Sequence, residues 1–482
     1  MELSFEKKNE IGFQYVLDLL EPCSCYGTAK IKTLAPYSSM QKNDLETELN
    51  NVEKGICSID RYPQLTNKLK HSFMHLKDVR PVIDKCRITS LNEVELFEIK
   101  RFLLTLREIY PVFSNLNDYI AFEGINMIDL NDALNIVDPD KTGVPSFYIS
   151  ETCSDVLREV RKQKKAIEHL IRSGEGNKDD LLIERTMIAA KEEEAELEVK
   201  KDMSTKLIPF LENMLVNIDA ICKMDLLFAK ADLSRKYVSC KPVISKEIFS
   251  MENMVNPKIS DLLSEKDKSF TPITITLKPG ATVITGANMG GKSVALKTVA
   301  LNTLLVLCGM YPFATKATVS MLDNIYVISE DLESIDRGLS SFGGEIIEFN
   351  SIAKKLDDKA LVVLDEFARG TNPDEGAAIV RATTKWLQNK SSFSVLSTHY
   401  DNVADYAGAH YQVIGLKDID FDMLKKKIDQ NEKNKGADTI AEHMNYGLYK
   451  VEGKQDCPKD ALNICRLLDL DPEIVKLAEN YY

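Results

Sequence analysis

The sequence predicts an α-helical region followed by an α/β domain, and three observations predict this class. Over roughly the first 250 residues, apolar residues recur at helical spacing and glycine is rare. From about residue 270, short apolar runs alternate with helical stretches, as in an α/β domain. A chain of 482 residues is also too long for one ordinary hydrophobic core, so at least two domains are expected.

The best-defined helix of the first region is expected to begin near residue 90. Ser90 and Glu93 have the spacing of a capping box, in which each side chain satisfies a backbone N–H at the helix start. The apolar residues that follow share one helix face: Leu96, Ile99, Leu103, Leu106 and Tyr110. Because a helix with one apolar face must bury that face, we expect these helices to form an α-helical core.

Residues 154–215 are expected to form a protruding antiparallel helical hairpin. Two long helical patterns flank a glycine-rich turn at 173–177, and their outer faces are dense in charge. Two interpretations stay open: a solvated structural arm, and an arm that grips a partner. From Asp155 to Met203 there are 11 basic and 13 acidic residues, a formal charge of −2. An arm that embraces DNA would be expected to carry excess positive charge near its tip, so DNA is not the favoured partner.

Pro257 marks the transition to the α/β domain. Apolar and polar residues alternate over 273–277, and Pro279-Gly280 then turns the chain. The further strand candidates are Ala281–Thr285, Ile325–Ile328, Ala360–Leu364, Ser394–Ser397 and Gln412–Leu416. The charged segment 417–435 is expected to form an exposed connection, which a short helical tail follows.

Composition and charge narrow the class of protein. The hydrophobic content is 44%, and the N-terminus lacks the apolar core of a secretory signal. No apolar run reaches the roughly 20 residues that cross a bilayer, so no membrane partner is expected. Ten cysteines are scattered without metal-site or disulfide spacing, which indicates reduced thiols in the cytoplasm. The formal net charge of −13 does not favour duplex DNA binding, although it leaves room for a local basic patch.

The most specific motif is Gly286-Ala287-Asn288-Met289-Gly290-Gly291-Lys292-Ser293, which fits the phosphate-loop pattern G-x-x-x-x-G-K-[ST]. It follows an apolar strand and opens an apolar helix, the context that distinguishes the motif from a chance match in a loop. Its glycines let backbone N–H groups approach nucleotide phosphates. Lys292 would reach the β- and γ-phosphates, and the Ser293 hydroxyl would bind Mg²⁺, so the motif predicts ATP with Mg²⁺ as ligands.

A second motif ends the apolar run 361–364 with Asp365 and Glu366. Ligands of parallel sheets lie at the carboxyl ends of the strands, so both carboxylates are expected to face the phosphate loop from the neighbouring strand. Asp365 would hold Mg²⁺ through water, and Glu366 would orient and polarise the attacking water. Two adjacent acids at a strand end are otherwise common as a helix cap, but the phosphate loop favours the catalytic interpretation.

His399 follows another short apolar strand and is a third candidate. A neutral imidazole there could donate a hydrogen bond to the γ-phosphate or contact the attacking water. A single histidine at a strand end is more often structural. Its position after the other two motifs favours the catalytic interpretation.

These residues together resemble the MutS family of ABC-type ATPases. The resemblance runs through Thr285–Ser293, Asp365–Thr371 and Thr398-His399, and Gly338–Glu345 resembles the family's signature loop. In the family that loop reaches across a dimer to the γ-phosphate held by the partner, which implies such a role for Ser340. Phe270 stands where the family places an aromatic residue against adenine.

The resemblance implies an α plus α/β fold with a definite domain order. It comprises a lever-like helical core at 1–153, a clamp-like helical hairpin arm at 154–215, a helical return at 216–258, an ABC-type P-loop ATPase domain at 259–440 and a C-terminal helical dimerisation tail at 441–482. In the tail, the segment from Tyr446 onward resembles the family's dimerising helices. The chain is therefore expected to form a homodimer, with ATP sandwiched between subunits.

The chain also departs from the family pattern. Ala287 replaces the usual proline of the phosphate loop, and Ser341 with Gly343-Gly344 alters the signature loop, changes that the ATPase should survive. The N-terminus enters the helical core almost at once, so we expect neither mismatch-reading and connector domains before it nor a nuclease domain after the ATPase. Ordinary mismatch repair is therefore not expected.

Two main functions remain in competition. The favoured one is a partner-remodelling ATPase, similar to the MutS-like reactivases of cobalamin-dependent aminomutases such as lysine 5,6-aminomutase. There, dimer closure would move the arms and promote cofactor exchange in a client enzyme, and an accessory subunit is a further candidate partner. The alternative is a DNA-structure-binding clamp that acts in repair or recombination and hydrolyses ATP in response to DNA. A regulatory switch that reports ATP through dimerisation is a third, weaker interpretation.

Overall fold

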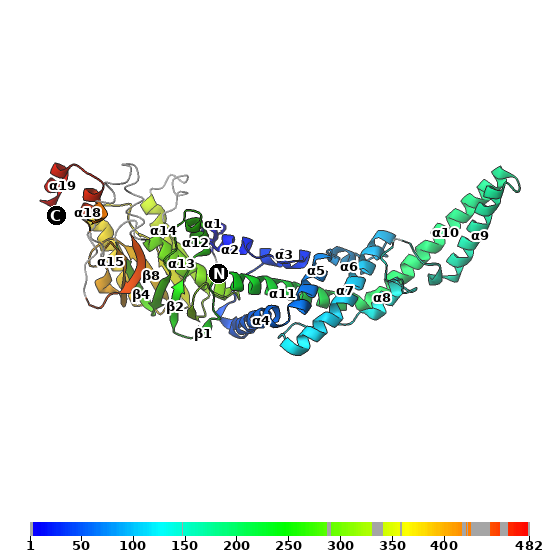
Figure 1. Cartoon of the computed structure of the whole chain (residues 1–482), viewed down its shortest axis with the longest axis horizontal. Coiled ribbons are helices and arrows are strands. Elements are labelled where there is room, and N and C mark those ends of the chain that lie inside the picture. The colour runs from blue at the N-terminus through cyan, green and yellow to red at the C-terminus, as the bar shows by residue number, and fades with distance from the viewer. Residues whose placement is uncertain are drawn as a thin grey trace. The chain divides into compact units, whose positions relative to one another are not determined.

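The computed structural model describes residues 3–146, 148–286, 291–329, 341–356, 359–416, 421, 423–425, 444–453 and 461–480. The chain forms two compact units (Figure 1). Unit 1 comprises Met1–Leu20, Leu34–Glu53 and Asp232–Tyr482, and unit 2 comprises Glu21–Thr33 and Lys54–Ala231. Within the described residues, no helix is both long enough and apolar enough to cross a membrane.

The division differs from the predicted domain order at the N-terminus. Two N-terminal segments that the sequence assigned to the helical core belong instead to the unit that contains the α/β domain. The first of them forms α1 (Phe5–Ile11) and α2 (Phe13–Asp18), which contact α13 (Lys292–Leu307). Three apolar side chains explain the docking, because each is nearly inaccessible to solvent: Ile11, Phe13 and Val16.

Unit 2 is helical. Its elements are α3 (Cys25–Lys32), part of α4 (Lys42–Arg61), α5 (Pro63–Met74), α6 (Arg80–Cys86), α7 (Glu93–Ile120), α8 (Asn131–Val137), α9 (Asp155–Ser173), α10 (Lys178–Leu207) and most of α11 (Leu211–Lys236). The predicted capping box is wrong by two residues: Asn92 and Glu95 form it, and α7 begins at Glu93. Asn92 takes this role because its backbone is extended and its side chain accepts from the Glu95 N–H.

Helices α9 and α10 form an antiparallel hairpin (Figure 1), where the sequence predicts the arm. Gly174 ends α9 in the left-handed conformation that glycine adopts without strain, and Asn177 caps the start of α10. The two helices share a small apolar core of Val160, Ile167 and Ile188. The two helices also form ion pairs, since Arg161 on α9 contacts Glu192 and Glu196 on α10.

Unit 1 contains a six-stranded sheet in the order β10-β9-β4-β8-β7-β6. Its strands are β4 (Gly280–Thr285), β6 (Asn324–Ile328), β7 (Ala360–Leu364), β8 (Phe393–Thr398), β9 (Ala409–Gly415) and β10 (Asn445–Lys450). All pair in parallel except β10, which is antiparallel to β9. Every residue of β4, β7 and β8 is buried, as a parallel strand covered on both faces requires.

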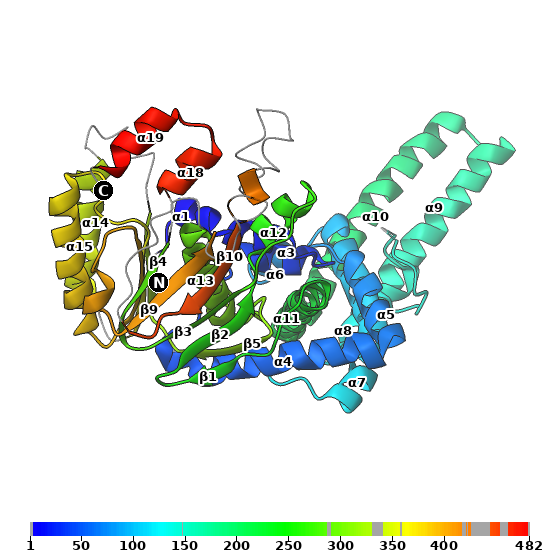
Figure 2. The ribbon, with the colours of Figure 1, turned by 60° about the vertical axis from the view of Figure 1, so that its left-hand side comes forward.

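Helices cover this sheet. Helix α14 (Ser341–Lys355) and α15 (Pro373–Gln388) share a core with β4, β7 and β8, and they lie side by side (Figure 2). Helix α13 contacts β6, β7 and β8. Its residues are almost continuously buried from Ala295 to Leu307, so it is a central helix of the unit.

A second, four-stranded sheet has the order β1-β5-β2-β3. It is built from β1 (Val243–Ser245), β2 (Phe249–Met254), β3 (Ile273–Leu277) and β5 (Lys316–Ser320). The sequence predicted β3 but not the other three, because they are short or interrupted by polar residues such as those of Phe249–Met254. Helix α12 (Pro257–Ser264) connects β2 to the segment that precedes β3.

The C-terminal tail is only partly helical. Residues 446–450, which resemble dimerising helices in the sequence, form β10 instead. Tyr446 and Tyr449 favour a strand, and β10 covers the edge of β9 that would otherwise lie open. The helices α18 (Ala461–Leu467) and α19 (Pro472–Glu479) follow it.

Candidate nucleotide-binding site

The phosphate loop begins where β4 ends and finishes where α13 begins. Of its predicted residues, Ala287, Asn288, Met289 and Gly290 lie outside the described residues, as does Ser340 of the signature loop. At the flanks glycine is required. A Cβ on Gly286 would lie 3.0 Å from Val413, and one on Gly291, whose φ is +82°, would lie 2.8 Å from the Tyr446 ring.

Lys292 is only 3% exposed, although it carries a charge. Its ammonium donates to the Gly286 carbonyl at 2.9 Å and lies 3.5 Å from a Glu366 carboxylate oxygen. A buried cation requires such compensation. The two predicted motifs therefore meet at the Lys292 ammonium.

One strand separates β4, which leads into the phosphate loop, from β7, which leads into Asp365 and Glu366. The sequence placed the acids on the strand next to β4, but β8 lies between β4 and β7. Ser397 at the end of β8 connects the two sides. Its hydroxyl donates to Asp365 at 2.6 Å and accepts from the Glu366 N–H at 2.9 Å. Ser397 stood beside the predicted His399 in the sequence, but only the sheet order shows that it holds both acids.

The backbone after β7 is strained. Glu366 and Ala368 have φ values of +47° and +61°, a region that non-glycine residues occupy at a cost of about 1–3 kcal/mol each. The turn is held by Ser397 and by Glu345, a buried carboxylate on α14 that accepts from the Ala368 N–H at 2.8 Å. Arg369 also donates to Glu366 at 3.0 Å. Such maintained strain is typical of a functional site.

His399 follows β8 directly. Burial lowers the pKa of its imidazole, as do the charges of Lys292 and Arg369, while Glu366 opposes them. The ring is therefore neutral at physiological pH. Its Nδ1 is buried and, within the part of the chain that the structure describes, has no hydrogen-bond partner. An orphaned polar atom of this kind suits a ligand or an ordered water.

One cavity of about 960 Å³ contains several of the predicted residues. Phe270, Lys292, Ser293 and Glu366 all line it, and so does Tyr446 from β10. The volume lies at the upper end for small-molecule sites. Phe270, predicted only from resemblance, thus shares a cavity with the phosphate-loop lysine. Tyr446 was missed because its position depends on the pairing of β10.

A buried polar network fixes β10 against the base of the phosphate loop. The Tyr449 hydroxyl donates to Gln412, whose amide donates to the Thr285 hydroxyl at 3.3 Å. The Thr285 hydroxyl also contacts His410 Nε2 at 2.7 Å. Thr285 immediately precedes the loop, so the strand that carries Tyr446 is joined to the strand that carries the loop.

The residues present fit a magnesium ion held together with a nucleotide. Ser293, the second residue of α13, lines the cavity. Asp365 accepts a hydrogen bond from the Ser397 hydroxyl, which orients its carboxylate. The described residues include no cluster of three or more His, Cys, Asp or Glu that could hold a metal alone. Mg²⁺ in nucleotide sites is held by one or two protein oxygens with phosphates and water, which agrees with this donor set.

A glycine loop between a parallel strand and a buried helix, facing an Asp-Glu pair, is typical of P-loop nucleotide-binding domains. Residues 282–467 match the family model described as MutS domain V. The chain is 25% identical over 426 residues to "Endonuclease MutS2" of Caldicellulosiruptor saccharolyticus, covering 76% of this chain and 52% of that protein. The chain is thus similar to MutS2 and Msh3 proteins, and residues 282–467 carry the match to MutS domain V.

Two further relatives match shorter stretches of the chain at higher identity. "DNA mismatch repair protein Msh3" of Homo sapiens is 29% identical over 290 residues, 58% of this chain and 25% of that protein. An "Endonuclease MutS2" of Acetivibrio thermocellus is 33% identical over 219 residues, 45% of this chain and 27% of that protein. The chain spans about half the length of the C. saccharolyticus relative and less of these two.

Proposed function

We propose that this chain is a Mg²⁺-dependent ATPase of the MutS type. The observation that carries the proposal is the 3.5 Å approach of Lys292 to Glu366 beside a cavity that Phe270 and Ser293 also line. Similarity to MutS-family proteins supports the same conclusion. The cavity offers the aromatic ring of Phe270 for the base, and the Lys292 ammonium with the Ser293 hydroxyl for the phosphates.

Each residue has a defined task in this proposal. Lys292 binds the β- and γ-phosphates, and Ser293 and Asp365 hold Mg²⁺, which would neutralise charge that develops on the phosphates. Glu366 accepts a hydrogen bond from the attacking water and polarises it. Neutral His399 donates a hydrogen bond at the γ-phosphate side. Ser340 is proposed to contact the nucleotide of a partner subunit.

Nucleotide binding by the full chain tests the first of these roles. Lys292→Ala is expected to weaken binding of Mg·ATP by about a hundredfold, since it removes a charge-assisted contact to the phosphates. Calorimetric titration with a non-hydrolysable ATP analogue measures the change. Lys297→Ala, on the same helix, is the matched control for loss of a lysine. Equal affinity of wild type and Lys292→Ala would contradict the assignment of the phosphate loop.

For the macromolecule on which the ATPase acts, we favour DNA over an aminomutase client. The relatives compared above are named as endonucleases and as a DNA mismatch repair protein. One helix of the arm is also net basic, although the arm as a whole is not. Helix α9 carries six basic and three acidic residues, and its exposed cations include Arg158, Lys162, Lys165 and Arg172.

DNA binding and DNA-dependent hydrolysis distinguish the two functions. Fluorescence anisotropy with duplex and junction DNA is expected to show affinity that falls with salt, with a log–log slope of about −0.9 for each phosphate contacted. Lys162→Glu combined with Arg172→Glu should weaken binding, whereas the matched change Lys191→Glu on α10 should matter less. Stimulation of hydrolysis by an inactivated aminomutase with its partner subunits, and not by DNA, would restore the reactivase interpretation.

A further inference from the structure

The N-terminal helices contact elements that form the candidate nucleotide site. Helix α1 contacts α13, which begins at Lys292, and α2 contacts both α13 and α12. Helix α12 contributes Ile259 and Leu263 to the nucleotide cavity. It is tied to the N-terminus by a hydrogen bond of 2.7 Å from the Tyr15 hydroxyl to Asp261.

A series of polar contacts runs from α13 through α1 to the end of β6. Lys297 on α13 lies 3.1 Å from one carboxylate oxygen of Glu10. The Ser329 hydroxyl, directly after β6, donates to the other oxygen at 2.8 Å. Lys7 donates to the same Ser329 hydroxyl at 2.8 Å. The two oxygens of Glu10 are therefore held by two different elements of the α/β unit.

The end of β6 is in turn bonded to the strand that carries the candidate catalytic acids. The Asp365 N–H donates to the Ile328 carbonyl at 2.8 Å, one residue before Ser329. Glu10 thus connects the helix that begins at Lys292 with the strand end that precedes Glu366. The connection therefore involves only α1, α13 and the ends of β6 and β7.

The polar contacts of Glu10 orient the elements that they join, and they are not what attaches the N-terminal helices. Burial of Ile11, Phe13 and Val16 already attaches the N-terminal helices to the unit. Burial raises the pKa of the Glu10 carboxyl, but the hydrogen bond from Ser329 and the charges of Lys297 and Lys7 outweigh burial, so the pKa is lowered. Glu10 is therefore an ionised group with fixed geometry at neutral pH.

We propose that Glu10 is a positioning residue for ATP hydrolysis, holding α13 and the ends of β6 and β7 in a fixed relation. The inference rests on the proposed ATPase function and adds to it. Nucleotide binding depends on the loop, α13 and the aromatic side chains of the cavity, whereas hydrolysis also needs the acids to be correctly placed relative to the phosphates. Loss of Glu10 should therefore lower kcat more than nucleotide affinity.

Steady-state hydrolysis by full-length variants tests this split. Glu10→Gln keeps the size of the side chain but removes the charge and replaces one of the two acceptor oxygens by an NH₂ donor. It is expected to lower kcat by about tenfold to a hundredfold, because small misplacements of catalytic groups have effects of this size. Affinity for a non-hydrolysable ATP analogue should stay within about twofold, the pattern of an interaction needed only for the chemical step. Glu6→Gln, an exposed acid on the same helix, is the control and should match wild type.

A second variant separates positioning from folding. Lys297→Met should reproduce the loss of kcat, and the double variant should be no slower than either single one, because both act through one contact. Unchanged kcat in Glu10→Gln, or additive losses in the double variant, would overturn the inference. So would equal losses of affinity, kcat and thermal stability. Absence of hydrolysis in the wild-type chain would instead contradict the proposed function itself, and with it the inference.

Discussion

At the scale of single residues, the candidate site is a set of charges that compensate one another. Lys292 lies beside Glu366, whose carboxylate also accepts from Arg369. A triphosphate brings negative charge to Lys292 and would compete with Glu366 for it. We therefore expect Mg·ATP to loosen the contact between Lys292 and Glu366, which leaves Glu366 available to a water molecule.

Tyr446 gives a prediction at this scale. Its ring lies against Gly291 and lines the same cavity as Phe270. Tyr446→Ala is expected to weaken ATP binding by about tenfold, since stacking of an aromatic side chain on a base contributes about 1–3 kcal/mol. Tyr446→Phe is the control that keeps the ring and should bind normally. Titration with an ATP analogue measures both, and undiminished affinity in Tyr446→Ala would exclude a contact with the base.

The residues that the sequence could predict are those that a local motif contains. Lys292 and Ser293 belong to a pattern of eight consecutive residues, and Asp365 with Glu366 ends one apolar run. Ser397, Glu345 and Tyr446 could not be assigned in the same way. Their roles arise from the order of strands and from the packing of α14, which no spacing in the sequence reveals.

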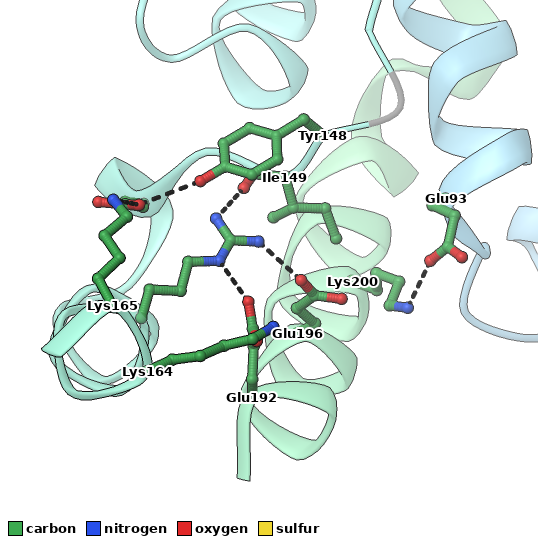
Figure 3. A network of polar contacts seen from close by, with 10 residues as sticks. Glu93, Tyr148, Ile149, Lys164, Lys165, Glu192, Glu196 and Lys200 are labelled. Atoms are coloured by element: carbon green, nitrogen blue, oxygen red, sulfur yellow. Dashed lines mark hydrogen bonds and ion pairs between the residues drawn. The ribbon is translucent and has the colours of Figure 1, made fainter. Parts of the chain in front are cut away.

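At the scale of elements, an ionic cluster joins the arm to the rest of unit 2. Arg161 on α9 donates to Glu192 at 2.9 Å and to Glu196 at 2.7 Å, both on α10, and to the Ile149 carbonyl at 2.6 Å (Figure 3). Its guanidinium lies 4.3 Å from the centre of the Tyr148 ring. The Arg161 side chain is 6% exposed, so these partners replace nearly all of its water.

Removal of Arg161 should loosen the base of the arm. Arg161→Met leaves Glu196 without its described cation and Glu192 with Lys164 alone, and disrupted buried ion pairs typically cost about 3–5 kcal/mol. Hydrogen–deuterium exchange over residues 155–207 is expected to accelerate. Arg158→Met is the matched control, because Arg158 is exposed and pairs only with the exposed Asp155 among the contacts described. Equal exchange in Arg161→Met and wild type would show that the cluster does not stabilise the arm.

Acid should have the same effect as that substitution. Burial alone would raise the pKa of Glu192. Lys164 and Arg161 lower this pKa by more than burial raises it, so the pKa lies below its ordinary value of 4.5. A carboxyl with a lowered pKa stabilises the fold above its unfolded pKa and loses that contribution as pH falls through the folded value. The protection of the arm should therefore decrease below about pH 4.5 and be constant near neutrality.

The strands that the sequence predicted include β3, whose residues alternate between buried and exposed, and three strands that are buried throughout. Strands β4, β7 and β8 consist of apolar residues with a few small Ser and Thr, because both faces of the sheet are covered. Strands β1, β2 and β10 escaped prediction because each is partly exposed and carries polar residues. The capping box was displaced because Ser90 and Asn92 both precede an acid by three residues, and only backbone geometry distinguishes them.

At the scale of the whole molecule, we propose a homodimer in which the C-terminal helices take part. Four large apolar side chains of α19 and of the turn before it are 40–53% exposed in the single chain: Leu468, Leu470, Ile474 and Leu477. A concentration of exposed apolar side chains is typical of an interaction surface. The dimer is supported by resemblance and by this surface, and it would bring a partner's Ser340 to the nucleotide.

Ile474→Glu combined with Leu477→Glu tests the role of this surface. The pair places two charges on the exposed apolar face and should shift the chain toward a monomer, as light scattering after size exclusion can measure. Glu473→Lys on the same helix controls for a change of charge alone. A mass identical to that of wild type at low protein concentration would exclude α19 from the dimer interface.

Hydrolysis in a single turnover tests the central claim most directly. Purified full-length protein, in excess over Mg·ATP, is compared with its Glu366→Gln variant and with Glu375→Gln, an exposed acid on α15. We predict that all three bind ATP, that wild type and Glu375→Gln hydrolyse it, and that Glu366→Gln is slower by about 10²–10⁴-fold, the usual contribution of a catalytic base. Equal rates in wild type and Glu366→Gln, or failure of the wild-type chain to retain Mg·ATP, would contradict the account.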